Sequence, residues 1–217
     1  PTSSLSSIFH PGCNMTNELT LSALISSRIC HDLISPIGAI NNGLELLAMT
    51  NSVGGEEIAL ITASAKSASD SLRFMRIAFG AASSTEMMGA SEIASIAAAH
   101  IGTPRLSVHW TADQRELNRA AAKLILLMAM TAATAAPLGG VLNIQDAPPG
   151  GFLYELDITG QKIAFAAPAA QALKGAADLE QLEPRFASFA LLALVARAAG
   201  YSVDWHMTDE AGRMTLR

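Results

Sequence analysis

The sequence predicts an α+β protein in which a long helical hairpin precedes a layered domain of helices and strands. From residue 16 to residue 82, apolar residues recur three or four positions apart, which is typical of amphipathic helices. A Gly-Gly pair at residues 54–55 divides this region, as expected for a turn between two helices. After residue 84, strand-like and helical stretches alternate, which favours helices layered on a sheet.

The helical region divides into two predicted helices, from about Thr16 to Met49 and from Glu56 to Ala82. Residues 1–15 lack periodicity and are predicted to be a flexible lead-in. One hairpin is half of a four-helix bundle, so we predict that residues 16–84 form a homodimer with two-fold symmetry. The alternative is that the second half of the chain covers the hairpin. The predicted buried stripe of the first helix consists of Ile25, Ile29, Leu33, Ile37, Ile40, Leu44 and Leu47.

Residues 85–217 are predicted to form the second, α+β domain, with helices and strands that are segregated into layers. Its predicted helices are Ser91–His100, Leu117–Ala136, Ala169–Lys174 and Phe186–Ala199. Its predicted strands are Arg105–Trp110, Val141–Gln145, Phe152–Thr159, Lys162–Ala166, Tyr201–His206 and Arg213–Leu216.

Composition and charge exclude several classes of function. The net charge of −5 and the lack of any Lys/Arg run argue against a nucleic-acid partner, because phosphate binding needs a concentrated basic surface. The apolar run at residues 120–136 is short and contains Lys123, so it predicts a buried helix rather than a membrane span. The two cysteines have no metal-ligand spacing. We expect a cytoplasmic protein without a membrane segment or a bound metal.

The first helix carries a histidine, His31, on the side opposite its apolar stripe. A neutral imidazole has a nitrogen lone pair at neutral pH, so an accessible histidine can act as a nucleophile. The alternative is an exposed histidine without a role. The residues that share its face are small, polar or cationic, which leaves room for a partner protein: Ser27, Arg28, Ser35, Gly38 and Asn42.

Residues near His31 suggest how it could be activated. Asp32 could accept a hydrogen bond from one ring nitrogen and leave the other to attack, and Arg28 could meet a phosphoryl group or a carboxylate. Pro36 is expected to bend the helix just past this site. Glycine is unfavourable within a helix, so Gly38 and Gly43 predict close approach of a partner or of a second helix. Arg73 and Arg76 on the second helix are expected to border the same docking face.

Four segments carry a resemblance to a known family: R-x-C-H-D-[LF]-x-S-P at Arg28–Pro36, G-L-[ED]-L-L at Gly43–Leu47, R-[IV]-A-F-G-A at Arg76–Ala81 and R-A-A-G at Arg197–Gly200. From about residue 19 onward, the chain resembles the alphaproteobacterial histidine phosphotransferases of the ChpT family. It is also similar, more distantly, to the dimerisation and ATPase halves of sensor histidine kinases.

The resemblance implies a phosphorelay protein in which His31 is the phosphoryl acceptor and Asp32 is its adjacent acid. In this family the donor is typically the receiver domain of a hybrid kinase, and the acceptors are response regulators that include the cell-cycle regulator CtrA. The receiver is expected to supply Mg²⁺, and no cofactor is expected on this chain. The resemblance also implies that residues 85–217 form a sandwich similar to a histidine-kinase ATPase domain.

Sensor-kinase ATPase domains carry an Asn-bearing helix and two Gly-rich loops. Here the Asn position falls at about Thr131 and the first loop corresponds to Asp157–Gln161. The second loop would precede the helix at Phe186–Ala199, where residues 183–194 contain no glycine. We therefore predict a degenerate ATPase-like domain that does not use ATP. Three hypotheses follow: a phosphotransferase acting through His31, an ATP-dependent histidine kinase, and a non-catalytic dimeric scaffold for receiver domains.

Overall fold

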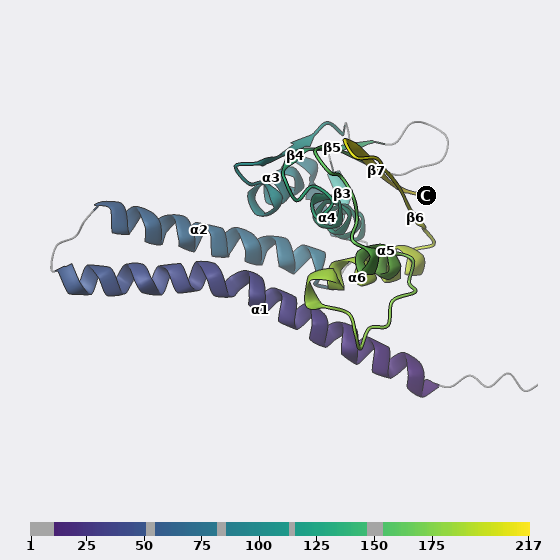
Figure 1. The fold of residues 1–217 in the computed structure, drawn as a ribbon, viewed down its shortest axis with the longest axis horizontal. Helices are drawn as coiled ribbons and strands as arrows, with labels where there is room; N and C mark the ends of the chain where they lie inside the picture. The colour runs from purple at the N-terminus through teal and green to yellow at the C-terminus, as the bar shows by residue number, and fades with distance from the viewer. Residues whose placement is uncertain (1–10, 51–54, 82–85, 113–115, 147–153) are drawn as a thin grey trace, which may run out of the picture.

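The computed structural model describes residues 11–50, 55–81, 86–112, 116–146 and 154–217. Two long helices, α1 (Pro11–Thr50) and α2 (Gly55–Ala78), lie side by side and extend beyond a domain of helices and strands (Figure 1). The fold is α+β, as predicted. In the part of the chain that the structure describes, no helix is long and apolar enough to cross a membrane.

The hairpin is held together by a close approach of its two helices. Gly43 is buried, and a Cβ at this position would lie 2.6 Å from Cγ1 of Ile61 on α2. The glycine therefore allows tight helix packing, one of the two predictions for it. Pro36 lies within α1, which bends near its middle (Figure 1). A proline within a helix removes one backbone hydrogen bond and is a common cause of such a bend.

The second part of the chain forms a five-stranded mixed sheet in the order β2-β4-β5-β7-β6. Strand β2 pairs with β4 in parallel, and the other neighbours are antiparallel. Short strands β1 (Met87–Gly89) and β3 (Glu116–Asn118) form a separate antiparallel pair. The strands of the main sheet are β2 (Leu106–Trp110), β4 (Gly140–Asp146), β5 (Tyr154–Gly160), β6 (Val203–Met207) and β7 (Ala211–Leu216).

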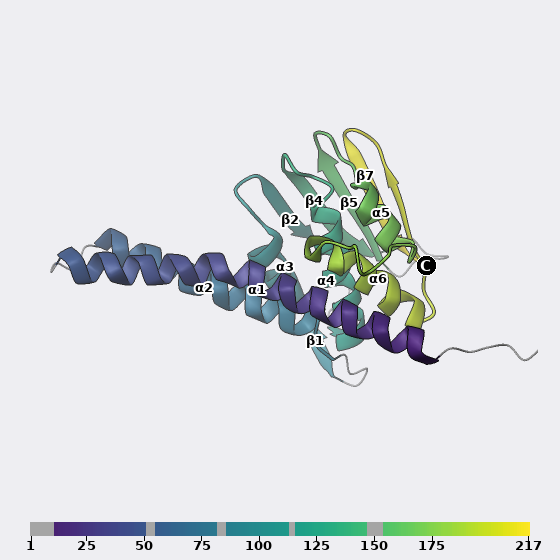
Figure 2. The ribbon, with the colours of Figure 1, turned by 60° about the horizontal axis from the view of Figure 1, so that its bottom comes forward.

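Helices cover one face of this sheet (Figure 2). Leu156 and Ile158 of β5 are buried, whereas the side chain of Asp157 between them forms an ion pair with Arg213 of β7. This alternation is expected of a strand with one face on the core. The helices of this part are α3 (Ala90–Ile101), α4 (Arg119–Ala133), α5 (Ala167–Leu173), the 3₁₀ helix η1 (Pro184–Phe186) and α6 (Ala187–Ala198).

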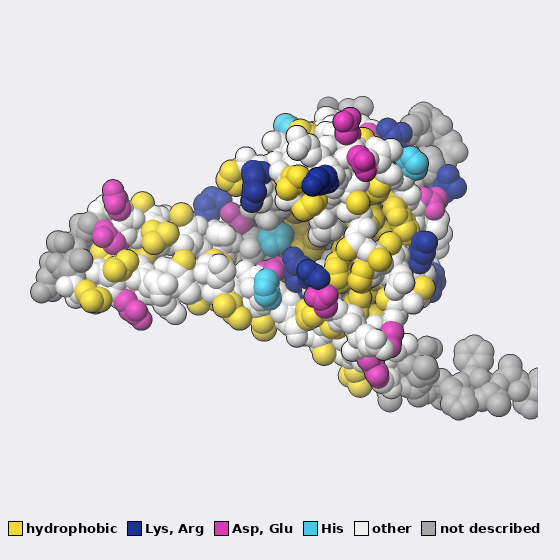
Figure 3. Space-filling view, in the orientation of Figure 1, with side chains coloured by type: hydrophobic (Ala, Val, Ile, Leu, Met, Phe, Trp, Pro, Cys, Tyr) yellow, Lys and Arg dark blue, Asp and Glu magenta, His cyan; other side chains and the backbone are white. Residues whose placement is uncertain are grey.

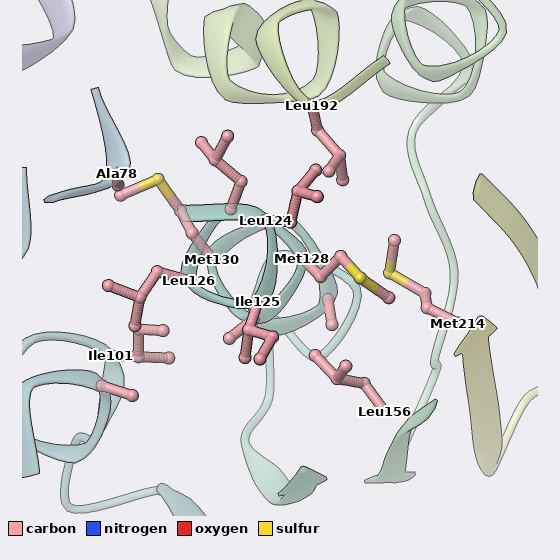
Figure 4. Close-up of a cluster of buried hydrophobic side chains, with 14 of the residues drawn as sticks. Ala78, Ile101, Leu124, Ile125, Leu126, Met128, Met130, Leu156, Leu192 and Met214 are labelled. Carbon is pink, nitrogen blue, oxygen red and sulfur yellow. The ribbon is translucent and has the colours of Figure 1, made fainter. Parts of the chain in front are cut away.

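Helix α4 is the centre of the hydrophobic core. Its residues from Ala122 to Ala132 are all buried, between the sheet and the neighbouring helices (Figure 4). Asn118 caps its start, because the side-chain oxygen accepts a hydrogen bond from the backbone N–H of Ala121 at 2.8 Å. Lys123 reaches out of the core, and its Nζ donates to the carbonyl of Gly80 at 2.8 Å.

Several predictions about single elements were wrong. Residues 162–166 are not a strand, although Ile163 is buried as a strand residue would be. Lys162 has a φ of 56°, which interrupts extended backbone directly after β5. Helix α1 begins at Pro11, five residues before the predicted start at Thr16. Proline suits the first helical position because its φ is already helical and its missing N–H is not needed there. The predictions for residues 1–10 and for a domain boundary at residues 84–85 lie outside the described residues.

The predicted apolar stripe of α1 is only partly covered within one chain. Ile25, Ile29 and Leu33 are half-buried, whereas Ile37 and Leu44 are 48% and 52% exposed. The prediction of a buried stripe was therefore wrong for a single chain. The second half of the chain covers the first half of α1, and the remainder extends past it (Figure 2).

Candidate functional site

The candidate site lies where α1 passes the C-terminal part of the chain. The His31 side chain is 84% exposed, and its Nδ1 lies 3.1 Å from Oδ1 of Asp32. Because a carboxylate only accepts hydrogen bonds, this contact favours the tautomer with the proton on Nδ1. Nε2 then carries the lone pair on an imidazole that a partner protein can reach.

Arg28 holds Asp32 from the preceding turn of the helix. Its Nε donates to Oδ2 of Asp32 at 2.7 Å, so the two carboxylate oxygens contact the two neighbouring side chains. Its Nη1 also donates to the backbone carbonyl of Arg185 in η1 at 3.2 Å. Arg28 thus connects the turn of α1 that carries His31 to the C-terminal part of the chain. The sequence did not predict this contact. The expected action of Arg28 on a phosphoryl group stays a prediction.

A second histidine, His100, borders the same region from the end of α3. Its ring stacks on Phe74 with centroids 4.3 Å apart, and its Nδ1 lies 3.1 Å from Oγ of Ser71. Burial lowers the pKa of His100 and outweighs the attraction of Asp32, which acts to raise it. Figure 3 shows histidine, acidic and basic side chains gathered where the hairpin meets the second part of the chain.

A cavity of about 320 Å³ opens beside this turn, between α1, α3 and α4. Arg28 and His100 line one part of it, and Arg105 and Thr134 line another. Two arginines and a histidine therefore lie in the wall of a cavity whose remaining lining is mostly apolar. Sequence reasoning missed His100 and Arg105, because both depend on how the two parts of the chain pack.

The other predicted docking residues on α1 lie on its surface. Ser35 and Asn42 are exposed, and a Cβ at Gly38 would meet nothing within 4 Å. No contact among the described residues therefore requires a glycine at position 38. Ile34, one turn after His31, is 69% exposed and was missed. Residues three positions apart are neighbours on a helix, so the sequence could have placed Ile34 beside His31.

The two arginines of α2 do not join the site directly. Nη2 of Arg73 lies 3.7 Å from Oε1 of Glu92 on α3, and the carbonyl of Arg76 accepts a hydrogen bond from Arg119. Among the described residues, no hydrogen bond or ion pair joins either arginine to His31. The expectation that they border a docking face stays a prediction.

The positions that would contact a nucleotide in a sensor kinase have other partners here. Thr131 is fully buried, and its hydroxyl donates to the carbonyl of Met128 at 2.8 Å. Asp157 lies in strand β5 rather than in a loop, with Oδ1 2.7 Å from Nε of Arg213. Within the described ranges, no three His, Cys, Asp or Glu side chains are close enough to hold a metal ion.

The family follows from comparison with known proteins. Residues 90–211 match the model of the histidine phosphotransferase C-terminal domain. This chain belongs to the histidine phosphotransferase family. It is 34% identical over 199 residues to a protein named protein phosphotransferase ChpT from Brucella abortus (strain 2308), with 89% of this chain and 93% of the relative covered.

A solved structure described as a bacterial phosphotransferase has the same fold as this histidine phosphotransferase. The two superimpose with a TM-score of 0.77 at 32% identity, covering 92% of this chain and 96% of the other. The predicted resemblance and the predicted phosphotransferase activity are thereby confirmed.

Proposed function

We propose that this histidine phosphotransferase carries a phosphoryl group on His31 between the aspartates of response-regulator receiver domains. The exposed imidazole, oriented by Asp32 and Arg28, is the observation that carries the proposal. The relative named ChpT shares nearly the whole length of the chain, which supports a place in a bacterial phosphorelay. By resemblance, the donor is a hybrid-kinase receiver and the acceptors are regulators of the CtrA type.

The transfer step needs only an aligned nucleophile from this chain. The lone pair of His31 Nε2 attacks phosphorus, the bond from phosphorus to the donor aspartate breaks, and that carboxylate leaves with its electron pair. A receiver aspartate then attacks the phosphohistidine in the reverse step. Because phosphoryl transfer passes through a loose transition state, alignment and charge stabilisation supply most of the catalysis.

The surroundings of His31 suit a receiver surface. Ile34 offers an exposed apolar contact, and Ser35, Gly38 and Asn42 leave the histidine accessible. Arg28 donates to the backbone carbonyl of Arg185, and the side chain of Arg185 is 65% exposed. This second cation is therefore accessible near His31. By resemblance, the receiver supplies Mg²⁺ from its own acidic pocket.

We infer that the functional unit is a dimer. Ile37 and Leu44 on α1 are seven residues apart and share one face of the helix, and both are exposed in a single chain, as is Ile58 on α2. A second hairpin would cover them in a four-helix bundle. Light scattering at several concentrations should detect a dimer that Leu44→Glu dissociates and that Leu138→Glu, an equally exposed site outside the hairpin, does not.

We further propose that the chain does not take its phosphoryl group from ATP. The burial of Thr131 and the ion pair of Asp157 support this, because both positions are engaged in the core or the sheet. An ATP-dependent histidine kinase and a non-catalytic scaffold are the competing functions.

The experiment uses the whole chain with a labelled receiver domain of a hybrid histidine kinase from the same organism. The receiver is phosphorylated on its aspartate, and wild type, His31→Gln and the exposed-histidine control His109→Gln are compared. We expect label on wild type and on the control, and a loss of at least about 10³-fold in His31→Gln, since no other group replaces the nucleophile.

Each other outcome identifies a competing function. Label transferred from ATP alone to wild type would make the chain a histidine kinase. Unchanged labelling of His31→Gln would place the acceptor elsewhere. No labelling by a receiver that binds would leave a scaffold.

A further inference from the structure

A second cavity lies at the far end of α6, away from the phosphotransfer site. It has a volume of about 820 Å³ and lies between the end of α5, the last turns of α6 and strand β6. Small-molecule sites have volumes of about 300–1,000 Å³, so this cavity has the size of a ligand site. We name it the α5–β6 cavity.

The lining of the α5–β6 cavity is cationic. Lys174, Arg197 and Arg217 contribute positive charges, and Asp204 contributes the one carboxylate, with its Oδ2 3.1 Å from Nε of Arg217. The chain as a whole has a net charge of −5. A local excess of positive charge within an acidic protein attracts an anionic ligand. Figure 3 shows Lys and Arg side chains gathered at the edge where β6 and the C-terminus lie.

The same lining holds large aromatic side chains, which are scarce in this chain. The sequence has 2 Trp and 2 Tyr, and one of each, Trp205 and Tyr201, lines the cavity. Trp205 packs against Phe165 in an edge contact, and Nζ of Lys174 lies 5.8 Å from the centroid of its ring. Because the Lys174 side chain is exposed and flexible, a flat ring could displace it from the Trp205 face.

One arginine of the lining is placed by a glycine. Gly175 has a φ of +70°, and a Cβ there would lie 2.6 Å from Nη2 of Arg197. Glycine adopts this conformation without strain, and its missing side chain leaves the space that the guanidinium occupies. The guanidinium of Arg197, an exposed residue, therefore lies against Gly175 at the border of the cavity.

The α5–β6 cavity is separate from the sites already described. Arg197 also borders a groove with Glu18 of α1, and the thirteen helical residues from there to His31 span about 20 Å. Thr131, at the predicted degenerate ATP position, does not line the cavity. A ligand here would not compete with the receiver for His31.

We propose that the α5–β6 cavity binds a nucleotide. The phosphate pairs with Lys174, Arg197 and Arg217, and the base stacks on Trp205. Cations alone would bind any phosphate, so the aromatic platform favours a ligand with a flat ring. An acidic peptide could use the cations but has no ring to stack.

The test titrates the full chain with GMP, AMP, inorganic phosphate and a Glu-rich peptide by calorimetry. Trp205 fluorescence is followed in a Trp110→Phe background. We expect saturable binding of a nucleotide with quenching of Trp205, and an affinity at least about tenfold above that of phosphate. Equal affinity for phosphate, binding of the peptide instead, or no nucleotide binding would overturn the proposal.

Variants locate the binding. Lys174→Gln and Trp205→Leu should each weaken nucleotide binding about tenfold or more, whereas the exposed control Lys162→Gln should bind like wild type. Circular dichroism checks that each variant is folded. Folded Lys174→Gln and Trp205→Leu variants that bind as tightly as wild type would place the nucleotide elsewhere.

Discussion

Helices α1 and α4 are both long and apolar, but they differ in how completely one chain buries them. The residues of α4 from Ala122 to Ala132 are all buried. On α1, Ile34, Ile37 and Met49 are 69%, 48% and 81% exposed. The contrast teaches that one chain is enough to bury α4, whereas the hairpin keeps large apolar side chains exposed in a single chain.

The largest expected effect comes from comparing a substitution in α4 with one in the exposed part of α1. Ile125→Ala removes a fully buried side chain of α4 and should lower the free energy of unfolding by about 2–5 kcal/mol. Leu44→Ala on α1 should change it little at concentrations where the chain is monomeric, and more where it is dimeric. Urea denaturation at two protein concentrations measures both. Equal losses at the low concentration would contradict the contrast.

The start of α4 offers a smaller effect. Asn118→Ala removes the oxygen that accepts from the N–H of Ala121 and should cost about 1 kcal/mol. Asn118→Asp keeps the acceptor and serves as the control. If the two variants unfold at the same urea concentration, the cap does not stabilise α4.

Two glycines of α1 sharpen the comparison within one helix. Gly43→Ala places a methyl group against Ile61 and should destabilise the hairpin by about 1 kcal/mol, because overpacking exceeds the gain in helix propensity. The methyl group of Gly38→Ala would have no atom of the described residues within 4 Å, so this variant should stabilise α1 by about 0.5–1 kcal/mol. Thermal unfolding distinguishes the two. If both variants shift the melting temperature in the same direction, the close approach of Gly43 to Ile61 does not determine the effect of the methyl group.

The smallest effect concerns pH. Burial lowers the pKa of His100 in the folded chain, so the unfolded chain binds the proton more readily. The stability contribution is then fully present above the unfolded pKa, about 6.5, and is lost as pH falls through the lower folded pKa. His100→Gln should flatten this dependence in urea denaturation between pH 5 and 8, whereas His206→Gln, at an exposed position, should not. If the free energy of unfolding of His100→Gln fell more steeply with falling pH than that of wild type, the pKa of His100 would not be lowered in the folded chain.

Local patterns predicted most of the helices and strands. They failed where the backbone turns out of the sheet and where a strand is very short. Residues 162–166 have a buried Ile163 and appear strand-like, yet the backbone leaves the sheet at Lys162. Strands β1 and β3 were missed because three residues are too few to show a period.

In the candidate site, too, the residues that are close in sequence were predicted and those that are distant were not. The spacing of His31, Asp32 and Arg28 on one helix was readable, and the structure brings these three side chains together. His100 and Arg105 were not predicted, because they reach the region only through the packing of α3 against the hairpin.

The sequence by itself determined the helical hairpin, the α+β class and the exposed histidine with its acidic neighbour, because each depends on residues a few positions apart. Only the tertiary structure decided that Arg28 contacts the carbonyl of Arg185, 157 positions away, and that Thr131 is buried. The physical reason is that helical periodicity is a local property. Which surfaces meet depends on how the whole chain buries its apolar side chains.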